Sequence, residues 1–129
     1  MGSTKKVGII LLLLLMAVNV EAFNKDYPLL KFEKGRDMQS DKQWVYSIPQ
    51  DYYKYVDVIY FVNKPIKRNG ELFDGYYKIR WSGNHKCYGG IIWLYNEASL
   101  QHELGHIYQI CVDKKDVSTE QYANNFIAR

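Results

Sequence analysis

The segment LQHELGHIYQIC, residues 100–111, constrains the fold of this chain more than any other stretch. Its apolar side chains recur at spacings of four, three and four residues: Leu100, Leu104, Ile107 and Cys111. This period is typical of an amphipathic helix with one buried stripe. Because a single helix cannot bury such a stripe alone, the rest of the chain must supply the surface that covers it.

The segments before this helix favour β-strands. Residues 55–63 and 76–82 are rich in β-branched and aromatic side chains, and 91–95 is a short apolar run. Alternation within 76–82 predicts a strand with one buried face, formed by Tyr77, Ile79 and Trp81. These strands are the surface against which the helix at 100–111 is expected to pack.

Two further segments complete the expected fold. The polar stretch 23–43 predicts irregular structure with room for one short helix, and 44–48 predicts a short strand that Pro49 ends. Towards the C-terminus, Ser118 fits the N-cap of a second helix, and Gln121 completes a capping box. The order of elements predicts an α+β fold, in which a small, mostly antiparallel sheet precedes the two packed helices.

The N-terminus has the layout of a secretory signal peptide. Lys5 and Lys6 precede an apolar run of 12 residues, and Val20-Glu21-Ala22 has small residues at the two positions that a signal peptidase inspects. The run is short, because a membrane-spanning helix needs about 20 residues. We therefore expect residues 1–22 to be removed and residues 23–129 to form one secreted or periplasmic domain. The alternative is a membrane-anchored chain with an uncleaved segment.

Charge and cysteine usage limit the partners. The formal net charge of +3 is mild and the lysines are scattered, so nucleic acid is not an expected partner. The chain has 12 tyrosines, 5 phenylalanines and 3 tryptophans, enough bulk for the core of a small monomer. In an exported protein Cys87 and Cys111 can either form a disulfide or remain two separate buried thiols.

The polar face of the helix at 100–111 carries two of the chain's three histidines. His102 and His106 lie one helical turn apart, with Glu103 beside the first. Two imidazoles at this spacing can bind one zinc ion, and the adjacent glutamate can then reach a zinc-activated water. Core histidines would share the apolar stripe, and a solvated face would more often use Lys, Gln and Glu. The pattern therefore favours one zinc ion per chain.

A third ligand is needed, because catalytic zinc usually has three protein ligands. No histidine follows His106, so the ligand must be a downstream carboxylate: Asp113, Asp116 or Glu120. We favour Glu120, since the loop between the helices can bring the second helix back beside the first. Asn124, one turn later, either accepts a hydrogen bond from a histidine ligand or is an ordinary surface amide.

HELGH followed by EQYANNF resembles the gluzincin class of zinc metallopeptidases, and within it the small ImmA/IrrE-type peptidases. In that family a helix reading Glu-x-x-Ala-Asn-x-Phe follows the zinc helix, and the matching residues here are Glu120, Ala123, Asn124 and Phe126. The resemblance covers residues 100–129. It implies a minimal zincin-like fold, the zinc ligands His102, His106 and Glu120, and Glu103 as the general base.

The expected function is hydrolysis of a peptide or protein substrate by a zinc metalloendopeptidase. Zinc activates water and polarises the scissile carbonyl, while Glu103 takes a proton from the water and delivers it to the leaving amine. The donor that stabilises the developing negative charge is left open among His85, Tyr95, Tyr108 and Tyr122. The strand at 91–95 either pairs with an extended substrate or is a plain buried strand.

Two other interpretations stay open. The chain can be a non-catalytic binding or structural domain that holds zinc, although Glu103 has no ligand role and so favours catalysis. It can also be a membrane-tethered or cytoplasmic protease that cleaves a regulator, as the resemblance suggests. The position of the mature N-terminus separates the second interpretation from an exported enzyme.

Overall fold

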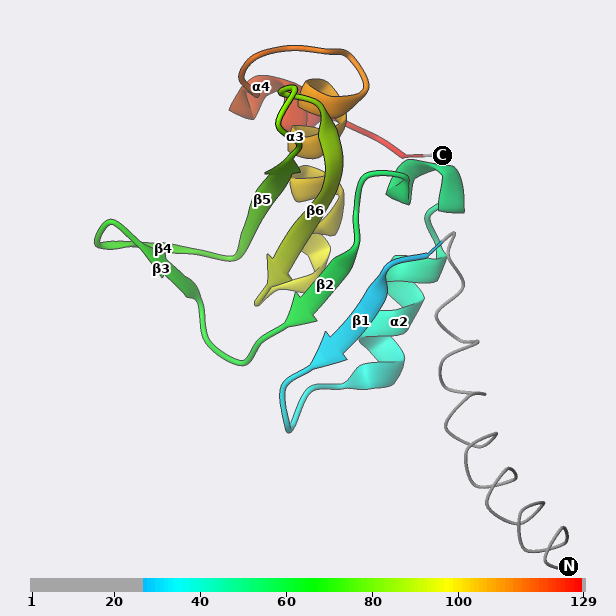
Figure 1. Ribbon diagram of the computed structural model, residues 1–129. Helices are drawn as coiled ribbons and strands as arrows, with labels where there is room; N and C mark the ends of the chain where they lie inside the picture. The colour runs from blue at the N-terminus through cyan, green and yellow to red at the C-terminus, as the bar shows by residue number, and fades with distance from the viewer. Residues whose placement is uncertain (1–26, 129) are drawn as a thin grey trace, which may run out of the picture.

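The computed structural model describes residues 27–128, so the predicted signal peptide at residues 1–22 lies outside the described part. The fold is α+β, as expected, and its main sheet has the strand order β1-β2-β6-β5 (Figure 1). Its four strands are β1 (Leu29–Phe32), β2 (Val58–Phe61), β5 (Gly75–Trp81) and β6 (Cys87–Leu94). Within residues 27–128 there is no helix long and apolar enough to cross a membrane.

The helices gather on one face of this sheet (Figure 1). The longer ones are α2 (Met38–Tyr46), which lies behind β1, and α3 (Leu100–Cys111), which lies behind β5 and β6. The shorter ones are the 3-10 helices η1 (Gln50–Tyr53) and η2 (Glu97–Ser99) and the final α4 (Glu120–Asn125). A separate hairpin of β3 (Ile66–Arg68) and β4 (Glu71–Phe73) projects from one side of the sheet.

The sheet is mixed rather than mostly antiparallel. β1 pairs with β2 in parallel, β2 pairs with β6 in parallel, and β5 pairs with β6 in antiparallel fashion. The connections explain these directions. The chain between β1 and β2 contains α2 and η1, a crossover long enough to start the next strand from the same end, whereas a short turn joins β5 to β6.

Several segments differ from their predicted structure: β6 begins at Cys87 rather than at 91, and Trp81, predicted on the buried face of its strand, is 46% exposed. The expected strand at 44–48 is wrong: this segment includes the end of α2, whose N-cap Asp37 accepts a hydrogen bond from the backbone N–H of Ser40. Asp41 and Val45, one turn apart, face the interior, whereas Trp44 is exposed, which is a helical pattern of burial. The stretch predicted as irregular contains β1, a strand of 4 residues.

The core lies between the sheet and α3. The predicted stripe of Leu100, Leu104, Ile107 and Cys111 is buried, with exposures of 0–2%. It packs in one cluster with four fully buried side chains of the central strands: Ile59, Phe61, Ile92 and Leu94. Burial of each such side chain contributes about 1.5–3 kcal/mol. This packing fixes which face of α3 points away from the core.

Arg36, in the loop after β1, is hydrogen-bonded to α2 and to the segments that follow β2 and β6. Its guanidinium donates two hydrogen bonds to the buried carboxylate of Asp41, at 3.0 and 2.7 Å. It also donates to the carbonyl oxygens of Val62 and Tyr95, at 2.8 and 2.7 Å. Asp41 and the hydrogen bonds that it accepts raise the pKa of Arg36. Because Tyr95 directly follows β6, these bonds hold the chain where it turns towards α3.

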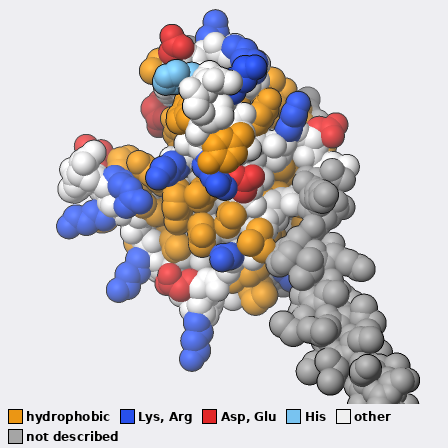
Figure 2. Space-filling view, in the orientation of Figure 1, with side chains coloured by type: hydrophobic (Ala, Val, Ile, Leu, Met, Phe, Trp, Pro, Cys, Tyr) orange, Lys and Arg blue, Asp and Glu red, His pale blue; other side chains and the backbone are white. Residues whose placement is uncertain are grey.

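The other face of the sheet carries no helix within the described residues. Figure 2 shows hydrophobic side chains gathered over the strands on this face, with Lys and Arg side chains around them. The aromatic rings of Tyr60, Trp93 and Tyr76 form a continuous row across β2, β6 and β5. Helices therefore cover one face of the sheet, and aromatic side chains cross the other. The candidate site described below lies on the face that the helices cover.

Candidate metal centre

α3 places two imidazoles on the face that points away from the core. His102 and His106 are one turn apart, and their Nε2 atoms are 3.2 Å from each other. The two rings meet edge to face, with centroids 4.7 Å apart. The apolar stripe on the opposite side of α3 determines this orientation, as the sequence predicts.

The short helix α4 brings a carboxylate to the same point. Oε1 of Glu120 lies 3.3 Å from Nε2 of His102, and Oε2 lies 2.6 Å from Nε2 of His106. Glu120 is the first residue of α4, after the N-cap Thr119, whose side chain accepts a hydrogen bond from the N–H of Tyr122. The cap is therefore Thr119 rather than the predicted Ser118.

The close approach of α3 and α4 depends on Gly105. A Cβ atom at this position would stand 2.7 Å from Cβ of Phe126 and 3.1 Å from Cα of Ala123. Any larger side chain would push α4 away from α3. The glycine inside HELGH thus helps to bring Glu120 to the histidines.

These three side chains could hold a metal ion. One ligand atom from each of His102, His106 and Glu120 lies within 4.8 Å of the other two. Two imidazole nitrogens and one carboxylate oxygen form a donor set that suits a divalent transition metal. Of the three downstream carboxylates, the structure brings Glu120 to the histidines, whereas Asp113 accepts a hydrogen bond from Tyr122 and Asp116 lines a different groove.

Ser118 forms a hydrogen bond with Nδ1 of His106. The Ser118 hydroxyl donates to Oε1 of Gln109 at 2.8 Å, so its oxygen is left to accept from Nδ1–H of His106, also at 2.8 Å. This arrangement leaves the lone pair on Nε2, the atom that faces His102 and Glu120. Burial lowers the pKa of His106, which favours the neutral imidazole that a metal requires.

Ser118 makes the hydrogen bond to a histidine ring that was one of the two alternatives for Asn124. Asn124 is exposed, and within residues 27–128 it has no hydrogen bond to either histidine. Glu120 and Asn124 lie one turn apart on α4, and Glu120, at its start, is the residue that reaches the histidines. Tyr77 of β5 also contacts the site, because its ring stacks on that of His106 with centroids 4.7 Å apart.

Glu103 lies beside the three candidate ligands but is not one of them. Its Oε2 is 4.0 Å from Nε2 of His102, and its side chain is 8% exposed, compared with 73% for Glu120. Burial, and to a smaller extent the charge of Glu120, raises the pKa of Glu103 to about 8. On its other side Glu103 meets the first residue of β5, where a Cβ on Gly75 would stand 3.0 Å from Oε2.

The residues considered as additional donors make contacts elsewhere. The ring of Tyr108 packs against Tyr52 and Phe126. The hydroxyl of Tyr122 donates to Asp113 at 2.7 Å. His85 is exposed in the turn between β5 and β6, and Tyr95, also exposed, contributes its backbone carbonyl to Arg36. Tyr77 reaches the site instead. The alternation of residues 76–82 predicts that its side chain faces the interior, and this is the sequence signal that could have indicated its position.

Two further predictions concern β6. Cys87 and Cys111 form a disulfide, with Cα atoms 5.6 Å apart, which joins the start of β6 to the end of α3. The segment 91–95, however, is not available to pair with a substrate, because β6 is bonded to β2 on one side and to β5 on the other. β5 is the edge strand beside the metal centre, and no strand of residues 27–128 pairs with its outer side.

Comparisons with models of protein families, with curated proteins and with solved structures found no match for this chain. The likeness to gluzincins therefore stays a prediction, and the case for a function lies in the geometry of His102, His106, Glu120 and Glu103.

Proposed function

We propose that this protein is an exported zinc-dependent peptidase. The observation that carries the proposal is the position of Glu103, a buried carboxylate 4.0 Å from a candidate ligand atom but outside the ligand set. A site that only held a metal would have no need for it. A hydrolytic site needs a group of this kind, because a general base must lie within reach of the attacking water.

The donor set favours zinc. Two histidines and one glutamate are a ligand set of catalytic zinc sites, which keep one coordination position open. The exposed Glu120 leaves the centre accessible from solvent. Zinc held by these residues would lower the pKa of water and polarise a carbonyl oxygen.

The chain's own residues supply the remaining steps. Glu103 takes a proton from the attacking water and returns it to the leaving amine, and its burial raises its pKa above that of a free carboxyl, towards the neutral range in which a general acid and base works best. Ser118 and Tyr77 fix the orientation of His106 through a hydrogen bond and a stacked ring. The free edge of β5 offers backbone groups to an extended peptide beside these side chains.

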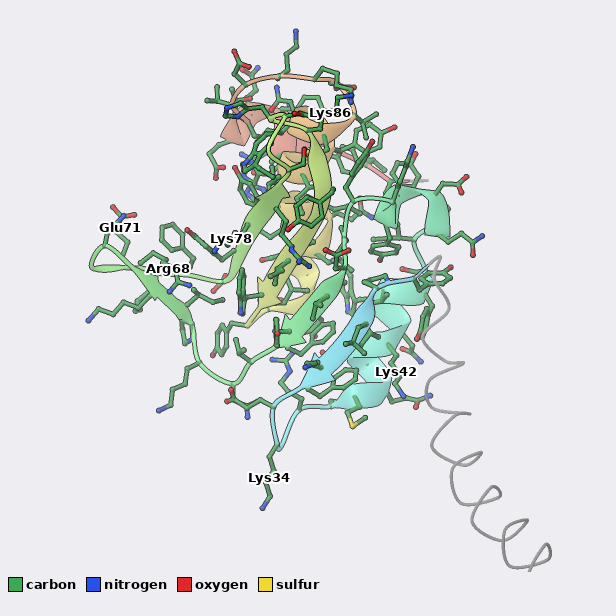
Figure 3. The ribbon with its side chains drawn as sticks, in the orientation of Figure 1. Lys34, Lys42, Arg68, Glu71, Lys78 and Lys86 are labelled. Carbon is green, nitrogen blue, oxygen red and sulfur yellow. A yellow bond between two sulfur atoms is a disulfide. The ribbon has the colours of Figure 1, made fainter. Side chains whose placement is uncertain are left out.

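The substitution Glu103→Gln tests the proposal, with Glu71→Gln as its control. Glu71 is an exposed glutamate of the β3–β4 hairpin, far from α3 (Figure 3). We expect Glu103→Gln to retain its zinc and to lose about 100- to 10,000-fold in the rate of peptide hydrolysis. Glu71→Gln should match the wild-type protein. Hydrolysis is measured on a mixture of fluorogenic peptides, and zinc by elemental mass spectrometry.

The same experiment examines the rival interpretation, a non-catalytic zinc domain. That interpretation predicts a zinc-loaded wild-type protein that hydrolyses none of the peptides. Normal hydrolysis by Glu103→Gln would instead remove Glu103 from the role of general base.

A further inference from the structure

A groove of about 470 Å³ lies at the end of β5, next to the disulfide. One wall is the end of β5 and the turn that follows it, with Trp81 and Lys86. The other wall is the loop after α3, with Lys114, Lys115 and Asp116. The side chain of Trp81 is 46% exposed, so an aromatic surface is open within the groove.

The groove is positively charged. Lys86, Lys114 and Lys115 are all exposed, and among residues 27–128 none of them forms an ion pair. Asp116 is the one carboxylate that lines the groove. Three ammonium groups facing one carboxylate attract an anionic ligand, and most strongly at low ionic strength.

Both walls of the groove lead along the chain towards the metal centre. Along β5, Trp81 is four residues from Tyr77, whose ring stacks on His106. A strand rises by about 3.3 Å per residue, so this interval is at most about 13 Å, because the register of β5 is irregular between Arg80 and Trp81. Along the other wall, Asp116 is two residues before Ser118, which holds His106. A peptide extended along the free edge of β5 would therefore pass the metal centre and enter the groove.

The groove is a fixed feature of the fold because the disulfide joins its two walls. Cys87 follows Lys86 at the start of β6, and Cys111 ends α3 just before the lysine-bearing loop. Both cysteines line the groove. A binding site that is already formed loses less entropy on binding than one that must be ordered.

We propose that this groove is a substrate subsite that selects peptides with an aspartate or glutamate about four residues from the bond that is cleaved. The inference rests on the proposed peptidase function and names its substrate class. The lysines bind the acidic side chain, while backbone bonding to β5 sets the spacing between that side chain and the metal centre.

Cleavage-site profiling tests the inference. The zinc-loaded protein is incubated with a complex mixture of peptides, and the cleaved bonds are identified by mass spectrometry. We expect Asp and Glu to be enriched three to five residues from the cleaved bond, on one side of it. The preference should weaken at about 1 M salt, where charges are screened over about 3 Å.

The double variant Lys114→Gln/Lys115→Gln should lower the preference for acidic over neutral peptides about tenfold, as expected for two exposed ion pairs. Its cleavage of neutral peptides should not change. The control is Lys34→Gln/Lys64→Gln, which removes the same charge from two exposed lysines outside the groove; Lys34 lies at the opposite end of the molecule from Lys86 (Figure 3).

The outcomes separate the two proposals. Zinc-dependent cleavage without enrichment of acidic residues, or an enrichment that the groove variant leaves intact, would overturn the subsite alone. An absence of zinc-dependent cleavage would overturn the proposed function and the subsite together.

Discussion

His106 is the residue on which most contacts of the candidate site converge. Its Nε2 faces His102 and Glu120, its Nδ1 is hydrogen-bonded to Ser118, and its ring stacks on Tyr77. Three elements, β5, α3 and the loop before α4, thus fix one imidazole. A ligand held in this way loses little freedom when a metal binds, which favours affinity.

The bond from Ser118 gives a prediction at the residue scale. Ser118→Ala removes the acceptor for Nδ1–H of His106, and we expect zinc affinity to fall about 10- to 100-fold. Asn124→Ala is the matched control, because Asn124 is exposed and should not affect zinc binding. Competition with a chromophoric chelator measures both affinities. A large loss in Asn124→Ala with none in Ser118→Ala would reverse the assignment.

Sequence reasoning identified the candidate ligands, which the structure brings together, better than the groups that support them. The four-residue spacing of His102 and His106 and the adjacent Glu103 can be recognised because helix geometry alone puts them together. Ser118 could not be assigned, because its position depends on the path of the loop after α3. For Asn124 the sequence left two roles open, because a helix of 6 residues is too short for a periodic pattern to indicate how it packs.

At the scale of elements, the contact between α3 and α4 decides whether Glu120 reaches the histidines. Gly105→Ala would place a Cβ 2.7 Å from Cβ of Phe126 and displace α4. We expect a loss of about 1–3 kcal/mol in the free energy of unfolding, together with weaker zinc binding. Gly83→Ala is the control, since a Cβ there meets no atom within 4 Å. Urea denaturation of the zinc-free and zinc-loaded proteins gives both quantities, and equal behaviour of the two variants would contradict the account.

The elements that could be predicted are those with a long or unambiguous pattern. The helix at Leu100–Cys111 is the clearest case, because its apolar stripe spans three turns. α2 could be mistaken for a strand at its end, because Trp44, Val45 and Tyr46 are side chains that strands prefer, while the capping residue that starts the helix lies seven residues before Trp44. β1 has 4 residues, which is too short for a period to stand out.

At the scale of the whole molecule, the disulfide between Cys87 and Cys111 closes a loop with a sequence separation of 24 residues around β6 and α3. Reduction should lower the free energy of unfolding by about 3 kcal/mol, because the unfolded chain gains freedom. Chemical denaturation of zinc-free protein, with and without a phosphine reductant, measures the difference. The Cys87→Ala/Cys111→Ala variant should not respond to the reductant; an oxidised wild-type protein no more stable than the reduced one would count against this role.

The order and direction of the strands cannot be predicted from local sequence patterns. Individual strands at 58–61 and 75–81 follow from their residues, but their order and direction follow from pairings between distant segments. The parallel pairing of β1 and β2 depends on α2 as a crossover, and the end of α2 was predicted to be a strand. Hence the α+β class could be predicted, whereas the mixed sheet and its free edge at β5 could not.

The most direct test of the central claim is the metal content of the purified protein, measured by elemental mass spectrometry without added zinc. The account predicts about one zinc ion per chain in the wild-type protein and its loss in His106→Ala, which lacks the most firmly held ligand. A folded wild-type protein that contains no metal and takes up no added zinc would contradict it.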